Sequence, residues 1–200
     1  MDKMKLKEKL INKWDVGLNL NNCWIQKELP FISKDARLNI LFNPIDTDKY
    51  THLFTNTDYH KLFKFYNSYN GCKLFSNSLC IYGIQSKSND LYQTYDLELE
   101  NKRISQMINT NDYVFFGSLG GQYVFGLKSN VNDENVYCID VDNGSVVKVY
   151  EDFDLMFETI FNNLYEEYDK NGVKLNKNKD FKKIKSLYNT TIEEKFLEGK

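Results

Sequence analysis

Two pairs of β-prone runs, each joined by a short turn that contains glycine, dominate the second half of the chain. Residues 136–141 and 146–150 flank the tetrapeptide Asp142-Asn143-Gly144-Ser145, and Asn-Gly is the strongest short-range signal for a hairpin. Residues 113–116 and 123–125 are aromatic and β-branched and flank a second, glycine-rich turn. Because a hairpin joins antiparallel neighbours, the chain is constrained to form an antiparallel sheet.

Apolar residues at helical spacing surround these hairpins. Residues 6–14 and 59–69 each carry such a stripe, and the longest one runs over residues 153–168 with Asp152 as its N-cap. A weaker pattern at residues 90–103 indicates a short helix. This order of helices and hairpins predicts an α+β fold, in which a mostly antiparallel twisted sheet has helices packed on one face.

The length of 200 residues corresponds to one domain. We expect residues 1–168 to form it, with a helical N-terminal region at residues 1–30 included. Residues 169–200 form a lysine-rich extension, whose apolar residues have the spacing of one more docked helix. These apolar residues are Phe181, Ile184, Leu187 and Tyr188.

Charge and hydropathy exclude several classes of protein. The 26 basic and 28 acidic residues give a net charge of −2, which argues against direct binding of nucleic acid. The apolar stretches are shorter than the roughly 18–20 residues of a membrane-spanning helix. The first ten residues are charged and contain no apolar signal core, so we expect a cytoplasmic protein that makes no contact with a membrane.

Catalytic motifs are absent from the sequence. His52 and His60 are the two histidines, and no Gly-x-Ser-x-Gly nucleophile elbow accompanies them. The four cysteines do not have metal-ligand spacing. We therefore expect no catalytic residue, no metal and no cofactor. One enzymatic alternative is a metal-dependent hydrolase that uses Asp140, Asp142 and Glu151. If Asp140 is counted as the first position of a calcium-binding loop, Asp142 and Glu151 fall at two further ligand positions of that loop.

Acidic residues are concentrated in one part of the chain. Eight of them and a single lysine fall between Asp133 and Glu158, whereas residues 170–185 are rich in lysine. The two segments pair with each other in the simplest interpretation. In the functional interpretation, the acidic face attracts a basic protein partner. The candidate contact residues are then Glu134, Asp140, Asp142, Glu151, Asp152 and Asp154.

Three segments together resemble the SUKH superfamily, the Smi–Knr proteins. The first is the aromatic helix at residues 59–69, which ends in Asn70-Gly71 and leads to a strand. The second is residues 114–127, a strand, a Gly-Ser-x-Gly-Gly turn and a returning strand. The third is residues 136–161, a hairpin followed by a Phe-rich helix. Family members usually carry Leu-Pro just before the aromatic helix, where this chain has Thr57-Asp58, so it resembles a divergent member.

The resemblance implies a single α+β domain without catalytic residues or cofactor. Many bacterial members look like immunity proteins that bind and neutralise a cognate toxin, often a nuclease. Others look like regulatory adaptors that bind a host protein without inhibiting a toxin. We therefore expect a protein-binding module whose partner is a basic toxin domain, with the adaptor as the alternative. The sequence is compatible with a monomer or a homodimer.

Overall fold

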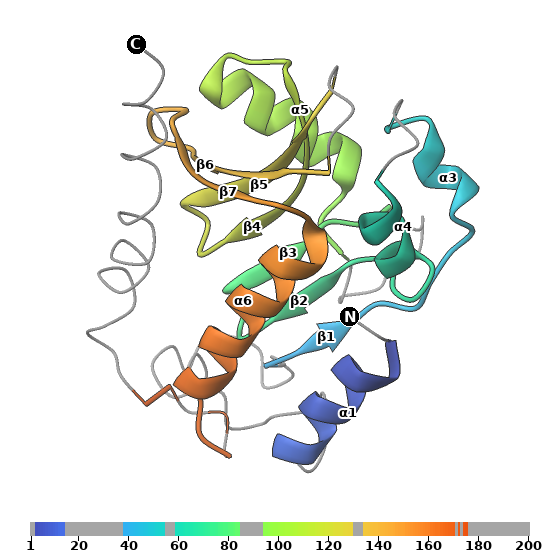
Figure 1. Cartoon of the computed structure of the whole chain (residues 1–200), viewed down its shortest axis with the longest axis vertical. Coiled ribbons are helices and arrows are strands. Elements are labelled where there is room, and N and C mark those ends of the chain that lie inside the picture. The colour runs from blue at the N-terminus through green and yellow to red at the C-terminus, as the bar shows by residue number, and fades with distance from the viewer. Residues whose placement is uncertain are drawn as a thin grey trace, which may run out of the picture.

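The computed structural model describes residues 3–14, 38–54, 59–84, 94–129, 134–170, 172 and 174–175 (Figure 1). The helices of this part of the chain are α1 (Lys3–Lys13), α3 (Asp48–Thr51), α4 (His60–Tyr66), α5 (Leu97–Ile108) and α6 (Phe153–Glu167). The strands are β1 (Ile40–Leu41), β2 (Cys72–Leu74), β3 (Leu79–Ile81), β4 (Tyr113–Leu119), β5 (Tyr123–Lys128), β6 (Val136–Asp140) and β7 (Val146–Tyr150). The predicted helix in the lysine-rich extension and most of the predicted N-terminal helical region lie outside the described residues.

The described strands form one sheet in which the spatial order is the chain order, from β1 to β7. Every neighbouring pair is antiparallel. Both predicted hairpins are present, with Leu119 opposite Tyr123 in β4–β5 and Val136 opposite Tyr150 in β6–β7. The α+β class with a mostly antiparallel sheet is therefore confirmed.

Helix α6 lies across one face of the sheet (Figure 1). The Phe153 ring lies 5.8 Å from that of Phe116 on β4, and the Phe161 ring lies 5.4 Å from that of Phe75. The predicted N-cap is confirmed, because the Asp152 side chain accepts a hydrogen bond of 2.8 Å from the backbone N–H of Leu155. Each buried Phe side chain of α6 stabilises the fold by about 1.5–3 kcal/mol.

Helices α1 and α4 pack beside α6 on this face. In α4, the Phe65 ring lies 5.6 Å from that of Phe157. The residues that predicted α1 include Leu10 and Trp14, both fully buried, and the Trp14 ring nitrogen donates to the backbone oxygen of Asp169 at 2.8 Å. The expectation of helices on one face thus holds for α1, α4 and α6.

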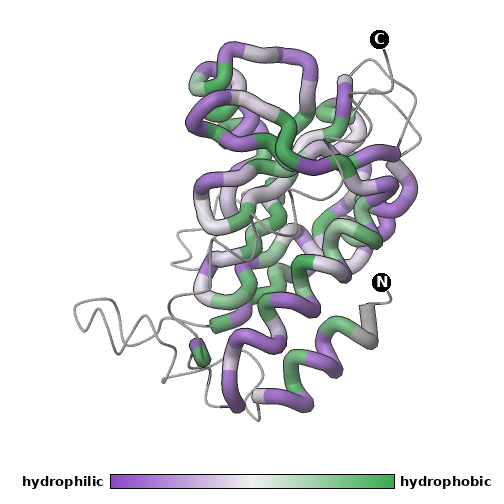
Figure 2. The backbone as a smooth tube through the Cα atoms, turned by 60° about the vertical axis from the view of Figure 1, so that its left-hand side comes forward, coloured by the Kyte–Doolittle hydropathy of each residue, from purple (hydrophilic) through white to green (hydrophobic). Residues whose placement is uncertain are grey.

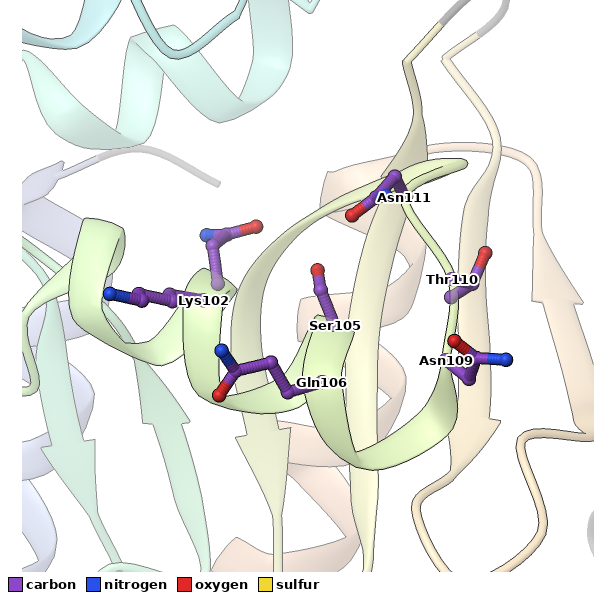
Figure 3. A pocket seen from close by; sticks show the side chains of 7 residues that line it. Lys102, Ser105, Gln106, Asn109, Thr110 and Asn111 are labelled. Carbon is purple, nitrogen blue, oxygen red and sulfur yellow. The ribbon is translucent and has the colours of Figure 1, made fainter.

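Helix α5 adds a cover on the opposite side of β4, since the strands lie between it and α6 (Figure 3). The sequence predicted a short helix at residues 90–103. The observed helix starts later, because Asp96 caps it by accepting a hydrogen bond from the N–H of Leu99, and it runs on to Asn109, whose left-handed conformation ends it. The Asn101 side chain bonds both the N–H and the carbonyl of Phe115, at 2.6 and 2.5 Å. This pair of bonds satisfies the backbone at the β-bulge between Phe115 and Gly117.

The corner between α4 and β2 is built around Asn70 and Gly71. The Asn70 amide exchanges two hydrogen bonds of 2.8 Å with the backbone of Ile84, and Gly71 has a φ of +83°. Helix α4 ends at Tyr66, earlier than the predicted stop at Asn70, because the last turn tightens and Ser68 N–H bonds to the carbonyl of Phe65.

Hydropathy follows this layering. Figure 2 shows hydrophobic residues concentrated in the strands at the centre of the molecule and hydrophilic residues in the turns. None of the helices in the described part of the chain combines the length and the apolarity that a bilayer-spanning segment needs.

Candidate partner-binding surface

The structure separates the six predicted contact residues into two groups. Asp140 and Asp142 lie at the turn of the β6–β7 hairpin, and we call them the turn acids. The other four lie at the opposite end of the hairpin, three of them where β7 runs into α6 and one just before β6, and we call them the helix-start acids: Glu134, Glu151, Asp152 and Asp154. The five residues of β7 separate the groups by about 16 Å, at the usual rise of a strand.

Backbone hydrogen bonds fix the turn acids in place. The N–H of Asp142 donates to Oδ1 of Asp140 at 2.9 Å, and the N–H of Gly144 donates to the Asp140 carbonyl at 2.8 Å. Gly144 has a φ of +69°, which a residue with a side chain rarely adopts. Asp142 is exposed and Asp140 half-buried. The turn therefore presents two carboxylates on a fixed loop.

The turn acids also act on a neighbouring tyrosine. Burial raises the pKa of Tyr123, and the negative charges of Asp140 and Asp142 raise it further. Tyr123 lies opposite Asp140 in the pairing of β5 with β6. The hairpin turn and the start of β5 thus share one negative environment.

Three of the helix-start acids lie around a lysine of α4. The Nζ atom of Lys61 lies 2.5 Å from Oδ2 of Asp152, and Glu134 and Asp154 are close enough to raise the pKa of Lys61 further. Burial alone would raise the pKa of Asp152, but the hydrogen bonds from Lys61 and from the Leu155 backbone lower it overall. Asp152 thus joins α4 to the start of α6, and Glu151 is the exposed member of the group.

The hydrolase alternative requires Asp140, Asp142 and Glu151 in one site. Strand β7 lies between the first two and Glu151, so the structure does not bring the three carboxylates together. Among the described residues, no group of three His, Cys, Asp or Glu side chains is arranged to hold a metal ion. The exposed side chain of His52 lies 2.8 Å from Oε1 of Glu98, where it connects α3 to α5.

Two features of the surface were missed by sequence reasoning. One is Lys61, whose neighbours in the sequence give no sign that it lies among the helix-start acids. The other is a polar hollow of about 460 Å³ beside α5, with Ser105, Gln106 and Asn109 in its lining (Figure 3). The helix predicted from the sequence ends at residue 103, before any of these three residues. The apolar pattern that predicted this helix therefore gave no indication of the hollow.

Comparison with protein families shows what the chain is similar to. A model of the SMI1 / KNR4 family (SUKH-1) matches residues 60–159, which is 100 of the 200 residues. The matched part begins at α4 and ends within α6, so it contains both hairpins and both acidic groups. No curated protein and no solved structure matches the chain.

Proposed function

The chain belongs to the SMI1 / KNR4 family (SUKH-1), and on this basis we propose that it is a non-catalytic protein-binding module, an immunity protein that binds and neutralises a basic toxin domain such as a nuclease. The observation that carries the proposal is the pair of acidic groups presented at the two ends of one hairpin. The family supports a protein partner, and the charge supports a basic one.

Charge complementarity supplies the mechanism. A nuclease binds the phosphates of its substrate through a positively charged surface. Carboxylates on an inhibitor are attracted to that surface, accelerate the encounter and block access of nucleic acid. The turn acids suit this role because the β6–β7 turn holds their backbone in one conformation. Among the helix-start acids, Glu151 is exposed, whereas Asp152 is occupied by Lys61 and the Leu155 N–H.

The proposal is tested by co-expression. The neighbouring gene is expressed in a bacterial host alone and together with this chain, and survival is scored. We expect the neighbour to kill the host and this chain to rescue it. A neighbour that is harmless alone and nevertheless co-purifies with this chain would contradict the immunity function and favour the regulatory adaptor.

Matched variants assign the contact within the same assay. Asp140→Lys with Asp142→Lys reverses the turn acids, and Glu151→Lys with Asp154→Lys reverses part of the other group without touching the cap. Glu8→Lys with Glu166→Lys, at exposed positions of α1 and α6, reverses the same number of charges and is the control for a general change in net charge. We expect loss of rescue with at least one of the first two variants and full rescue with the third. Full rescue by all three would remove the acidic groups from the interface.

A further inference from the structure

The hollow beside α5 has two walls. One is the C-terminal half of the helix, and the other is the segment that returns from it to β4 (Figure 3). Asn109 has a φ of +52° and reverses the chain, so that Thr110 and Asn111 run back along the helix. The lining contributes amide and hydroxyl oxygens, from Ser105, Gln106, Asn109, Thr110 and Asn111. These oxygens accept hydrogen bonds from a donor-rich group.

The electrostatics at this place favour a cation. The C-terminal end of a helix carries a partial negative charge, and the last turn of α5 contains no basic residue to compensate it. Asp112, which directly follows the lining segment, is exposed. Lys102 is the charged residue of the lining, and Figure 3 shows its side chain extending away from the returning segment.

The β6–β7 turn, which carries the turn acids, lies against the end of α5. A Cβ atom built on Gly144 would lie 3.5 Å from the Cβ of Ile108, so the β6–β7 turn packs against the last residue of α5. Ile108 directly precedes Asn109 of the lining. Asp140 and Asp142 make no ion pair with any basic residue of the described segments. Three of the helix-start acids differ in this respect, because Asp152 pairs with Lys61, and Glu134 and Asp154 lie close to it.

We propose that this hollow receives an arginine side chain of the protein partner, with the turn acids as its negatively charged rim. A planar guanidinium has five N–H donors, which match the amide and hydroxyl oxygens of the lining. The inference rests on the proposed function, since it names how the basic partner is recognised.

The test uses the full chain labelled with ¹⁵N and titrated with N-acetyl-L-arginine amide. N-acetyl-L-glutamine amide is the uncharged control ligand. Three variants accompany the unaltered chain: Ser105→Arg, which fills the hollow with its own guanidinium; Asp140→Asn with Asp142→Asn, which removes the rim charge; and Asn163→Arg, a matched substitution at an exposed position of α6. A dispersed amide spectrum of each variant confirms that it is folded.

We expect the arginine ligand to shift amide resonances of residues 105–112 and 140–145, and the glutamine ligand to leave them in place. The apparent affinity falls about threefold or more in Ser105→Arg and in the Asp-to-Asn variant, and is unchanged in Asn163→Arg. Equal arginine shifts in Ser105→Arg and the unaltered chain would overturn the inference, as would equal shifts from the two ligands.

The two proposals fail separately. If arginine binds here as expected but co-expression gives neither killing nor rescue, the hollow stands and the immunity function falls. If rescue is observed but arginine shifts no resonance of the hollow, the inference about the hollow falls alone.

Discussion

The carboxylate of Asp152 makes contacts with two different helices of the fold. Its Oδ1 caps α6 through the N–H of Leu155, while its Oδ2 lies 2.5 Å from Nζ of Lys61 on α4. The cap was predictable from the sequence, because Asp directly before an apolar stripe is a strong N-cap signal. The ion pair was not, because residues 61 and 152 are brought together only when α4 packs beside α6.

Two substitutions separate these roles of Asp152. Asp152→Ala removes the cap and is expected to lower the free energy of unfolding by about 1 kcal/mol from that loss alone. Asp152→Asn keeps an acceptor for Leu155 and removes only the charge, so a smaller loss is expected. Chemical denaturation at pH 7 measures both. A loss in Asp152→Asn as large as in Asp152→Ala would show that the cap contributes nothing.

The charge effect has a defined dependence on pH. The pKa of Asp152 is lowered in the folded chain, so the ionised carboxylate stabilises the fold above its unfolded pKa of about 4. This stability is lost as the pH falls through the lower, folded pKa. We therefore expect the difference between the unaltered chain and Asp152→Asn to be complete at pH 7 and to shrink below about pH 4. Denaturation curves with a constant difference from pH 7 to pH 3 would contradict this assignment.

At the scale of elements, the corner between α4 and β2 sets the position of α4 against the sheet. Gly71 is needed there for two reasons: its φ is +83°, and an added Cβ would lie 2.5 Å from the carbonyl oxygen of Ile81. Gly121 in the β4–β5 turn also has a positive φ, +75°, but an added Cβ there meets nothing within 4 Å. The pair therefore separates backbone strain from steric exclusion.

Gly121→Ala is expected to lower the free energy of unfolding by about 1–2 kcal/mol, the cost of a left-handed conformation for a residue with a Cβ. Gly71→Ala is expected to cost about twice as much or more, because the corner must also open. Thermal or chemical denaturation of the two variants measures the difference. Equal losses would mean that the corner accommodates the methyl group without moving.

The hairpins and the α6 stripe were predictable because their signals are local: Asn-Gly in a turn and apolar residues three and four apart. Helix α5 was predicted too early in the chain, at both its start and its end, because its buried face has few members, Leu97 and Ile104 among them, and its other apolar residues, such as Leu99, are exposed. The division of the acidic residues into two groups depends on the length and direction of β7. A count of charges along the chain contains no such information.

At the scale of the whole molecule, the proposed mechanism makes binding depend on charge. Reversing Asp142, Glu151 and Asp154 together to Lys is expected to weaken binding of the partner by several kcal/mol, about 3, if these carboxylates are buried in the interface. Association of the chain with its partner is also expected to slow with added salt, since screening shortens the range of attraction. Calorimetry measures the loss of affinity in the triple variant, and stopped-flow mixing measures the rate of association at each salt concentration. Unchanged binding by the triple variant would remove these acids from the account.

The proposed function requires that this chain act by binding and not by catalysis. Titration of the toxic activity of the neighbouring gene product with purified chain distinguishes the two. We predict that activity falls in proportion to the added chain and reaches zero at about one chain per toxin, as for a tight stoichiometric complex. Complete inactivation by a small fraction of an equivalent, increasing with time of incubation, would show turnover and rule out inhibition by binding, as would activity that no excess of the chain reduces.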